Sequence, residues 1–325
     1  MKSIILSLIQ GLSRGMISLE YLKKQEVYIL EKLNLTGIYP PIVTPFLKEE
    51  IAYHYLSENV EKLNNSGIKG FVVLGSNGEN VFLSEEEKIE VVKTVLRSAS
   101  RDMFIIVGSG CESARETIYL TNKLAKVGAQ AALVVTPCYY GSKMNDEALI
   151  KYYSTVADYT EIPVLLYNVP KFTGVNLSPQ ALSILSKHHH IIGIKDSSGD
   201  VNQLGQYLNK VDSNFNILVG TAGALLGALV LGCKGGILAL ANIAPERCVE
   251  IYQLAKAGKI DEARELQLRM IPVNQATTAT FGISGLKYAM DLLGYKGGET
   301  RSPLLPLKIE EKEKIKNILK EAKLI

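Results

Sequence analysis

Residues 191–198 read IIGIKDSS, an apolar run of strand length that ends in Lys195, Asp196 and two serines. A strand that reads as a continuous apolar run is covered on both faces, which is the pattern of a parallel sheet. An ammonium group among apolar side chains is costly to bury unless it is paired or neutralised. Two properties of the protein therefore depend on this stretch: the sheet that contains the strand, and the chemistry of its lysine.

Seven similar runs, rich in Val and Ile, alternate with longer segments of helical period. The eight predicted strands are GIYPPIVTPF (37–46), GFVVLG (70–75), MFIIVGSG (103–110), AALVVTP (131–137), PVLLYNVP (163–170), IIGIKDSS (191–198), NILVGTA (216–222) and GGILAL (235–240). The segment 84–99 is typical of the helices, because a serine cap and three acids open it. The alternation predicts a closed (β/α)8 barrel, the TIM barrel. An open doubly wound sheet is the alternative, but the first strand ends in TPF and lacks the GxGxxG fingerprint.

The chain continues well beyond the eighth unit. Residues 244–325 predict further helices, interrupted by GGETRSPLLP at 297–306. We therefore expect an N-terminal extension (1–34), the barrel (35–259) and a C-terminal helical extension (260–325) that packs on the barrel.

The first 19 residues contain Lys2 and Arg14 and no acid. One helical face would collect the apolar residues Ile5, Leu8, Ile9, Leu12 and Met16. This composition is typical of a mitochondrial transit peptide. A secretory signal and an amphipathic helix that docks on the protein are the alternatives. We expect the mitochondrial matrix as the location, with the cytoplasm as the alternative.

The composition excludes several classes of protein. The 325 residues are 47% hydrophobic and 21% charged, which is ordinary for a globular chain. The net charge of +3 and the lack of a basic stripe give no case for a nucleic-acid partner. The sequence contains no run of about 18 consecutive apolar residues, the length that predicts a membrane span. The four cysteines form no CxxC, and the adjacent histidines at 188–190 cannot all face one ligand, so we expect no metal site.

Polar residues and glycines gather where the predicted strands end. In a TIM barrel these ends meet at one rim, where the chemistry takes place. The residues are Thr44, Gly75–Glu79, Thr136–Tyr140, Tyr167, Asn168, Lys195–Ser197, Gly220 and Thr221. A neutral lysine amine at such a rim can attack a ketone and form an imine. The protonated imine accepts electrons, so the bond between C3 and C4 of a 2-oxo acid can break or form.

Imine chemistry also needs a proton shuttle and donors for the substrate carboxylate. Tyr167 ends the strand before that of Lys195 and suits the first role. The turn GSNGE at 75–79 offers backbone N–H groups and the Ser76 hydroxyl for the second. Taken singly, a rim lysine is more often an ion-pair partner, a tyrosine a packed aromatic, and such a turn a simple connection. Their shared position at one rim favours the chemical interpretation.

Six motifs resemble those of the pyruvate-dependent class I aldolases, the family of dihydrodipicolinate synthase and N-acetylneuraminate lyase. They are GIYPPIVTPF, GSNGEN, TPCYY, YNVPKFTG, GIKDSSGD and GGILALANIAPE, and the resemblance runs from about residue 35 to the C-terminus. It implies a (β/α)8 barrel with a helical extension, assembled as a homotetramer of two tight dimers. It implies a small 2-oxo acid as substrate. It implies no metal or organic cofactor, because the imine supplies the electrophile.

The resemblance also implies roles for particular residues. Lys195 would form the Schiff base, and Tyr167 would transfer protons. Ser76 and Asn77 stand where the family contacts the pyruvyl carboxylate. Tyr139 matches a tyrosine that is lent across the dimer interface to a neighbour's proton relay.

Within the family, the choice of reaction depends on residue 172. The synthases have an arginine in YNVPxRTG that binds the aldehyde's carboxylate, whereas this chain has Phe172, with Lys171 beside it as a possible substitute. The motifs GSNGE, GSGCES, VVTPCYY, KDSSGDV and FGISGLKYAMDLLGYKGG resemble the mitochondrial 4-hydroxy-2-oxoglutarate aldolases, which release pyruvate and glyoxylate in hydroxyproline breakdown. Ser197 and Gly220 fall on substrate-binding positions of that branch. We expect this cleavage; another aldolase or synthase of the family, or a catalytically silent interaction partner, are the alternatives.

Overall fold

The computed structural model describes residues 33–325, so the predicted transit peptide lies outside the described residues. Eight parallel strands form one sheet in the order β1-β10-β9-β8-β7-β6-β5-β4. They are β1 (Gly37–Tyr39), β4 (Gly70–Val73), β5 (Phe104–Gly108), β6 (Ala131–Val135), β7 (Val164–Asn168), β8 (Ile191–Asp196), β9 (Asn216–Val219) and β10 (Gly235–Ile237). The predicted (β/α)8 barrel is confirmed, and the doubly wound alternative is wrong because β10 pairs with β1.

The first strand is shorter than its apolar run. Pro40 and Pro41 have no N–H to donate to a ladder, and β1 ends at Tyr39. The chain nevertheless closes the ring here, because Val72 of β4 donates to the carbonyl of Pro40 (3.0 Å) and accepts from the N–H of Ile42 (2.9 Å). Beyond this point a small antiparallel hairpin forms from β2 (Phe46–Leu47) and β3 (Glu50–Ile51).

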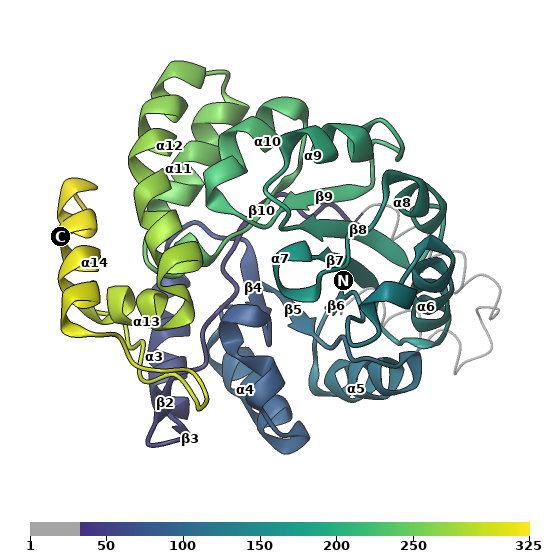
Figure 1. The fold of residues 1–325 in the computed structure, drawn as a ribbon, viewed down its shortest axis with the longest axis horizontal. Coiled ribbons are helices and arrows are strands. Elements are labelled where there is room, and N and C mark those ends of the chain that lie inside the picture. Colours follow the sequence, from purple (N-terminus) through teal and green to yellow (C-terminus); the bar gives the residue numbers. More distant parts are fainter. Residues whose placement is uncertain (1–32) are drawn as a thin grey trace.

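Each barrel strand is followed by a helix on the outside (Figure 1). In strand order these are α3 (Tyr53–Leu63), α4 (Glu85–Ser98), α5 (Ala114–Val127), α6 (Asp146–Tyr159), α8 (Pro179–Leu185), α9 (Val201–Leu208), α10 (Leu225–Leu231) and α11 (Pro245–Lys256). The predicted cap of α4 is confirmed: the Ser84 hydroxyl accepts from the N–H of Glu87, whose carboxylate accepts from the N–H of Ser84. Between β7 and α8 lies the short helix α7 (Pro170–Thr173).

The C-terminal extension forms α12 (Ile260–Gln275), a π-helical turn η6 (Ala276–Thr280), α13 (Gly282–Leu292) and α14 (Ile309–Glu321). These helices lie on one flank of the barrel (Figure 1), where α12 packs against α10 and α11. Short 3-10 turns complete the structure at η1 (Ser76–Gly78), η2 (Asn80–Phe82), η3 (Gly141–Lys143), η4 (Ala222–Ala224) and η5 (Ala239–Asn242). Among residues 33–325, no helix has the length and apolar character needed to cross a membrane.

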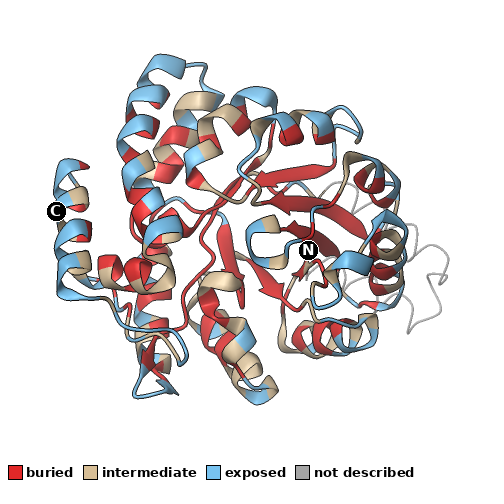
Figure 2. Cartoon of the chain, viewed as in Figure 1, coloured by how far each residue is buried: buried red, intermediate tan, exposed pale blue. Residues whose placement is uncertain are grey.

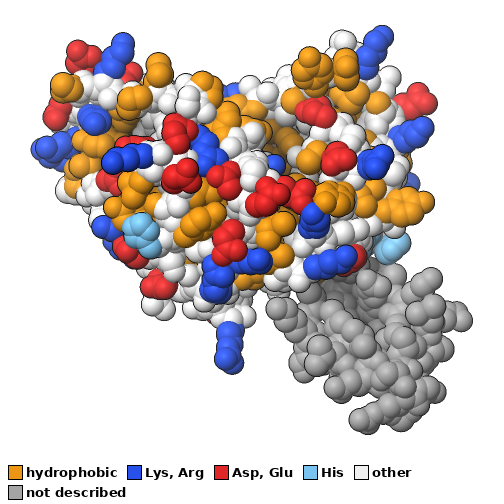
Figure 3. Space-filling view, turned by 90° about the horizontal axis from the view of Figure 1, so that it is seen from below, with side chains coloured by type: hydrophobic (Ala, Val, Ile, Leu, Met, Phe, Trp, Pro, Cys, Tyr) orange, Lys and Arg blue, Asp and Glu red, His pale blue; other side chains and the backbone are white. Residues whose placement is uncertain are grey.

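The strands divide the core into two layers, and almost every strand residue is buried (Figure 2). Inward-pointing side chains fill the barrel, among them Tyr39, Leu133, Leu165, Tyr167 and Leu218. Outward-pointing side chains pack against the helices in a larger second layer. The continuous apolar runs in the sequence reflect this burial on both faces. On the outer surface seen in Figure 3, acidic and basic side chains are interspersed without a field of one sign.

Candidate active site

Lys195 and Tyr167 meet at the carboxyl end of the barrel. The two residues are direct partners in the ladder between β7 and β8, so their side chains point to the same side of the sheet. The Lys195 Nζ lies 4.1 Å from the centroid of the Tyr167 ring, and both residues are buried, with exposed fractions of 4% and 6%. None of the acidic side chains at residues 33–325 forms an ion pair with Lys195. The amine therefore faces an aromatic ring instead of a counter-ion.

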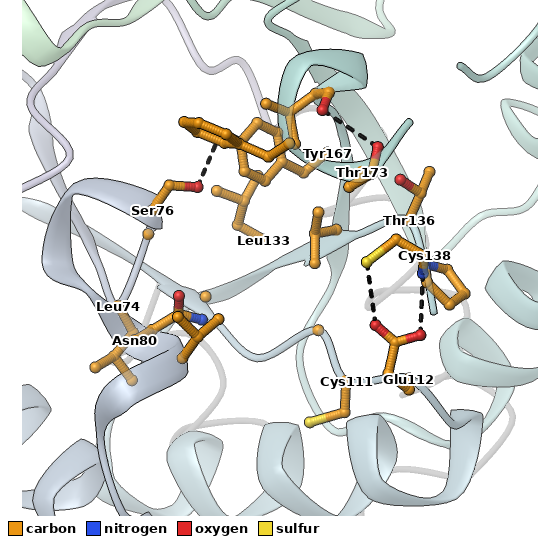
Figure 4. A pocket seen from close by; sticks show the side chains of 18 residues that line it. Leu74, Ser76, Asn80, Cys111, Glu112, Leu133, Thr136, Cys138, Tyr167 and Thr173 are labelled. Atoms are coloured by element: carbon orange, nitrogen blue, oxygen red, sulfur yellow. Dashed lines mark hydrogen bonds between the residues drawn. The ribbon is translucent and has the colours of Figure 1, made fainter. Parts of the chain in front are cut away.

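The hydroxyl of Tyr167 connects this pair to the turn after β4. Its Oη lies 3.3 Å from the Oγ of Ser76, as the dashed line in Figure 4 marks. The turn η1 uses two backbone bonds of its own, from Gly78 to the carbonyl of Gly75 (2.9 Å) and from Glu79 to the carbonyl of Ser76 (3.2 Å). The N–H groups of Ser76 and Asn77 begin the turn and have no acceptor within it. The turn thus offers a hydroxyl and backbone donors beside Tyr167.

A pocket opens over the ends of β4, β5, β6 and β7 (Figure 4). Its lining is Leu74, Gly75, Ser76, Asn80, Val81, Gly108, Gly110, Cys111, Glu112, Leu133, Val135, Thr136, Pro137, Cys138, Tyr167, Val169, Phe172 and Thr173. Most of these side chains are apolar, and the only charged one among them is Glu112. The Oγ1 of Thr136 is buried and has no hydrogen-bond partner among the described residues.

Ser197 and Gly220 contact each other at the ends of β8 and β9. The N–H of Gly220 donates to the carbonyl of Asp196 (2.6 Å), and a Cβ at Gly220 would lie 1.8 Å from the Oγ of Ser197. Only glycine therefore leaves room for the Ser197 hydroxyl in this position. Neither residue lines the pocket of Figure 4, but both lie at the same rim as Lys195.

Tyr139 and Lys171 are not part of the pocket lining. The Tyr139 ring is 79% exposed and meets the Tyr140 ring edge-on at 5.1 Å. Lys171 donates to the carbonyl of Thr278 in η6 (3.3 Å) and is not part of the pocket lining. Within the described chain, Lys171 therefore does not replace the arginine of the synthase motif, whereas Phe172 does line the pocket.

Glu112 was not identified as a functional residue from the sequence. One carboxylate oxygen accepts from the backbone N–H groups of Cys138 (3.0 Å) and Tyr139 (2.9 Å), and the other accepts from the Cys138 thiol (3.3 Å). The carboxylate thus holds the loop that carries Cys138 and Tyr139, and Figure 4 marks its contacts with Cys138. No pattern in the sequence indicates this contact, because an acid in a loop is usually solvated.

Asp196 lies on the opposite side of β8 from Lys195 and is fully buried. Its carboxylate accepts from Asn168 (2.7 Å), Gln203 (3.0 Å) and the Ser198 hydroxyl (2.5 Å). Burial raises the pKa of Asp196, and these three donors oppose that effect. Because Asn168 follows Tyr167 and Asp196 follows Lys195, the Asn168–Asp196 bond links the two strands directly beside the reactive pair.

No cluster of three or more potential metal-ligating side chains occurs among residues 33–325. In the same part of the chain, Cys111, Cys138, Cys233 and Cys248 are free thiols.

The model of the dihydrodipicolinate synthetase family matches residues 34–322. The 4-hydroxy-tetrahydrodipicolinate synthase of Archaeoglobus fulgidus is 35% identical over 290 residues, which cover 89% of this chain and 99% of that protein. The enzyme of the same name from Methanothrix thermoacetophila is 36% identical over 285 residues, covering 87% and 95%.

Solved structures of the same kind superpose closely on the chain. The dihydrodipicolinate synthase of Thermotoga maritima has a TM-score of 0.85 at 29% identity and covers 90% of this chain and 100% of that one. The chloride-inhibited synthase of Acinetobacter baumannii, solved in complex with pyruvate, has a TM-score of 0.84 at 33% identity, with the same coverage of 90% and 100%.

Proposed function

The chain belongs to the dihydrodipicolinate synthetase family of pyruvate-dependent class I aldolases and synthases, and from that premise we propose that Lys195 forms the imine. The observation that carries the proposal is the environment of its amine. Lys195 is buried, faces the Tyr167 ring at 4.1 Å and is paired with no acid among the described residues. Burying a lysine without such a partner is costly, and a reactive amine accounts for the position.

In the direction of cleavage, the amine of Lys195 adds to the C2 carbonyl of a 4-hydroxy-2-oxo acid, and water leaves to give a protonated imine. Removal of the 4-hydroxyl proton then breaks the bond between C3 and C4 and releases an aldehyde. The electron pair stays on C3 as an enamine. Protonation of C3 and hydrolysis of the imine release pyruvate and restore the amine. Condensation is the same sequence in reverse.

Tyr167 is the proton carrier in this proposal, because it lines the pocket and its Oη lies 3.3 Å from the Oγ of Ser76. Ser76 and Asn77 bind the carboxylate of the 2-oxo acid through the turn η1. Tyr139 serves a neighbouring subunit of a homotetramer; its exposed ring supports this role, since it does not reach the pocket of its own chain.

Two aldehyde components are candidates. The relatives named above are 4-hydroxy-tetrahydrodipicolinate synthases, which favours condensation of pyruvate with aspartate semialdehyde. Phe172 in the pocket wall favours cleavage of 4-hydroxy-2-oxoglutarate to pyruvate and glyoxylate. The carboxylate of glyoxylate is bonded directly to its aldehyde carbon, so it lies beside the reacting carbon. The carboxylate of the semialdehyde is two carbons farther out, and there the pocket offers a phenyl ring and Glu112 but no cation.

The imine is tested by incubation with pyruvate, reduction with borohydride and measurement of the intact mass. We expect a pyruvyl adduct on the natural protein and none on Lys195→Ala. Circular dichroism of the variant should be unchanged, because the alanine keeps the backbone of β8. An adduct that persists on Lys195→Ala would assign the imine to another lysine, and no adduct on the natural protein would contradict the proposed function.

A further inference from the structure

We infer that Glu79 and Lys287 are positioning residues, a buried ion pair through which the C-terminal extension holds the turn that carries Ser76 and Asn77. The inference rests on the proposed function, since it concerns the carboxylate end of the same site. It assigns a role in substrate binding to a helix that lies outside the (β/α)8 barrel.

Lys287 lies on α13 and is 1% exposed. Its Nζ lies 2.5 Å from the carboxylate of Glu79 and donates to the carbonyls of Thr44 (2.7 Å) and Glu299 (2.6 Å). These three acceptors match the three protons of an ammonium group. The Phe46 ring covers the remaining side at 4.6 Å. All hydrogen-bonding capacity of the Lys287 ammonium group is therefore used inside the protein, and the group is not exposed to solvent.

Glu79 directly follows η1 and is 2% exposed. Its backbone φ of 52° lies in the left-handed region, which is unfavourable for a residue with a Cβ. One carboxylate oxygen contacts Lys287, and the other accepts from the backbone N–H of Arg301 (3.0 Å). Both oxygens are thus held by residues of the C-terminal extension, and these contacts stabilise the strained backbone at the end of the turn.

A second connection runs through Thr44. Its carbonyl accepts from Lys287, and its hydroxyl donates to the carbonyl of Gly78 (2.8 Å), inside the turn. Arg301 extends the same attachment further along the chain, because its guanidinium binds the carbonyl of Phe82 (2.9 Å) and both oxygens of Glu87 (2.8 and 2.7 Å). Residues of the C-terminal extension therefore hold the end of the turn η1 and the segment that follows it.

The positions of Lys195 and Ser76 separate formation of the imine from binding of the carboxylate. Lys195 lies on β8, far along the sheet from β4, and its position does not depend on η1. Ser76 does depend on η1, and with it the 3.3 Å contact to Tyr167. Loosening the ion pair should weaken binding of the pyruvate carboxylate and leave the amine able to form an imine. Loss of affinity with retained chemistry at saturation distinguishes a positioning role from a general loss of structure.

The test uses the double variant Glu79→Gln/Lys287→Met, which removes both charges and leaves neither ion buried alone. Borohydride trapping at pH 7 over a range of pyruvate concentrations gives the half-saturating concentration and the final extent of adduct. Burial lowers the pKa of Lys287 to about 8, so Lys287 is charged in the natural protein at this pH. We expect the half-saturating concentration to rise by about tenfold to a hundredfold, with the final extent unchanged.

Lys62→Met is the matched control. Lys62 also ties the barrel to the C-terminal extension, since its Nζ donates to the carbonyls of Leu293 (3.2 Å) and Gly294 (3.1 Å), but it does not contact the turn. We expect its half-saturating concentration to equal that of the natural protein. If the double variant does not fold, Glu79→Gln and the natural protein are compared at pH 9. The amide keeps an acceptor for the N–H of Arg301. Because pH 9 lies above the lowered pKa of Lys287, the variant then leaves no ion buried alone.

The outcomes separate the two proposals. A folded double variant that binds pyruvate like the natural protein overturns the positioning role alone. An equal loss in Lys62→Met also overturns it, because the effect would then belong to any weakening of the extension. A natural protein that forms no adduct overturns the proposed function and this inference together.

Discussion

Phe172 is the residue on which the choice of aldehyde depends. It lines the pocket, is 63% exposed, and occupies the position of the arginine in the synthase motif. An arginine–carboxylate pair in a partly desolvated site contributes on the order of 1.5–3 kcal/mol. If it acts in the transition state, this corresponds to roughly a tenfold to hundredfold change in kcat/KM.

We therefore expect the natural protein to have a higher kcat/KM for cleavage of 4-hydroxy-2-oxoglutarate than for condensation with aspartate semialdehyde. Phe172→Arg should raise the value for the condensation by roughly tenfold to a hundredfold. Both reactions are measured on the same preparations, and Phe172→Gln controls for loss of the ring. A natural protein that prefers the semialdehyde would contradict the cleavage and leave the synthase reaction as the function.

At this scale the sequence identifies residues that end a strand, because the periodicity shows where each strand stops. The periodicity predicts Lys195 and Tyr167 at strand ends in this way. In the structure, the Nζ of Lys195 lies 4.1 Å from the centroid of the Tyr167 ring. The contacts of Glu112 and of the Glu79–Lys287 pair could not be predicted. They join loops or helices distant in the chain, and their geometry follows from tertiary packing instead of from a local pattern.

At the ends of β7 and β8, two neighbouring residues of each strand point to opposite faces of the sheet. Tyr167 and Lys195 face the barrel interior, while Asn168 and Asp196 face the helices and bond to each other. Alternation along a strand makes this division unavoidable. The reactive side is therefore held by a polar network on the other side of the same sheet. That network includes the buried carboxylate of Asp196, which forms no ion pair with a lysine or arginine at positions 33–325.

Asp196 should make the stability of the fold depend on pH. Burial raises its pKa in the folded state above the ordinary value of 3.8, so the folded protein binds the proton more tightly than the unfolded chain does. The free energy of unfolding should then fall as the pH rises from 3.8 towards the folded pKa, and stay level above it. Asp196→Asn keeps an acceptor for Asn168 and should lose this dependence.

Urea unfolding at several pH values between about 3.5 and 7 measures the effect. Relative to the natural protein, Asp196→Asn should gain stability across this range. Asp261→Asn, at an exposed position of α12, should show no such gain. Parallel pH curves for the natural protein and Asp196→Asn would mean that the hydrogen bonds fully offset the burial of the charge.

Among the elements, the first strand differs most from its sequence pattern. The apolar run 37–46 predicts a long strand, but β1 covers only Gly37–Tyr39. The two prolines cannot donate to a ladder, and Phe46 joins the hairpin β2–β3 instead. Apolar character alone does not distinguish a strand from a buried segment beside it, so strand ends are the part of the pattern least determined by periodicity.

The whole molecule combines a barrel that periodicity predicts with an extension whose attachment it does not. Eight alternating units fix the number of strands and the parallel sheet. The sequence also predicts helices after the barrel, but no pattern indicates that Lys287 of α13 contacts Thr44, in the segment after β1, and Glu79, at the turn after β4. Such contacts depend on how the finished parts pack together.

The first 34 residues should direct the protein to mitochondria and be dispensable for catalysis. Fluorescent fusions with and without this segment are compared in cells, and the same two forms are compared by borohydride trapping with pyruvate. We expect mitochondrial fluorescence only with the segment and equal trapping for both. Identical distribution of the two fusions would contradict the targeting role.

The closure of the ring has a consequence for synthesis of the protein. β1 finds one of its partners in β10, so the strand that leaves the ribosome early has an open edge until Gly235–Ile237 have been made. During that interval the nascent chain presents unpaired backbone groups at both ends of a growing sheet, an arrangement that invites pairing with other chains. Translation speed and chaperone occupancy over the first two hundred residues or so should therefore decide how much of this enzyme reaches its native state.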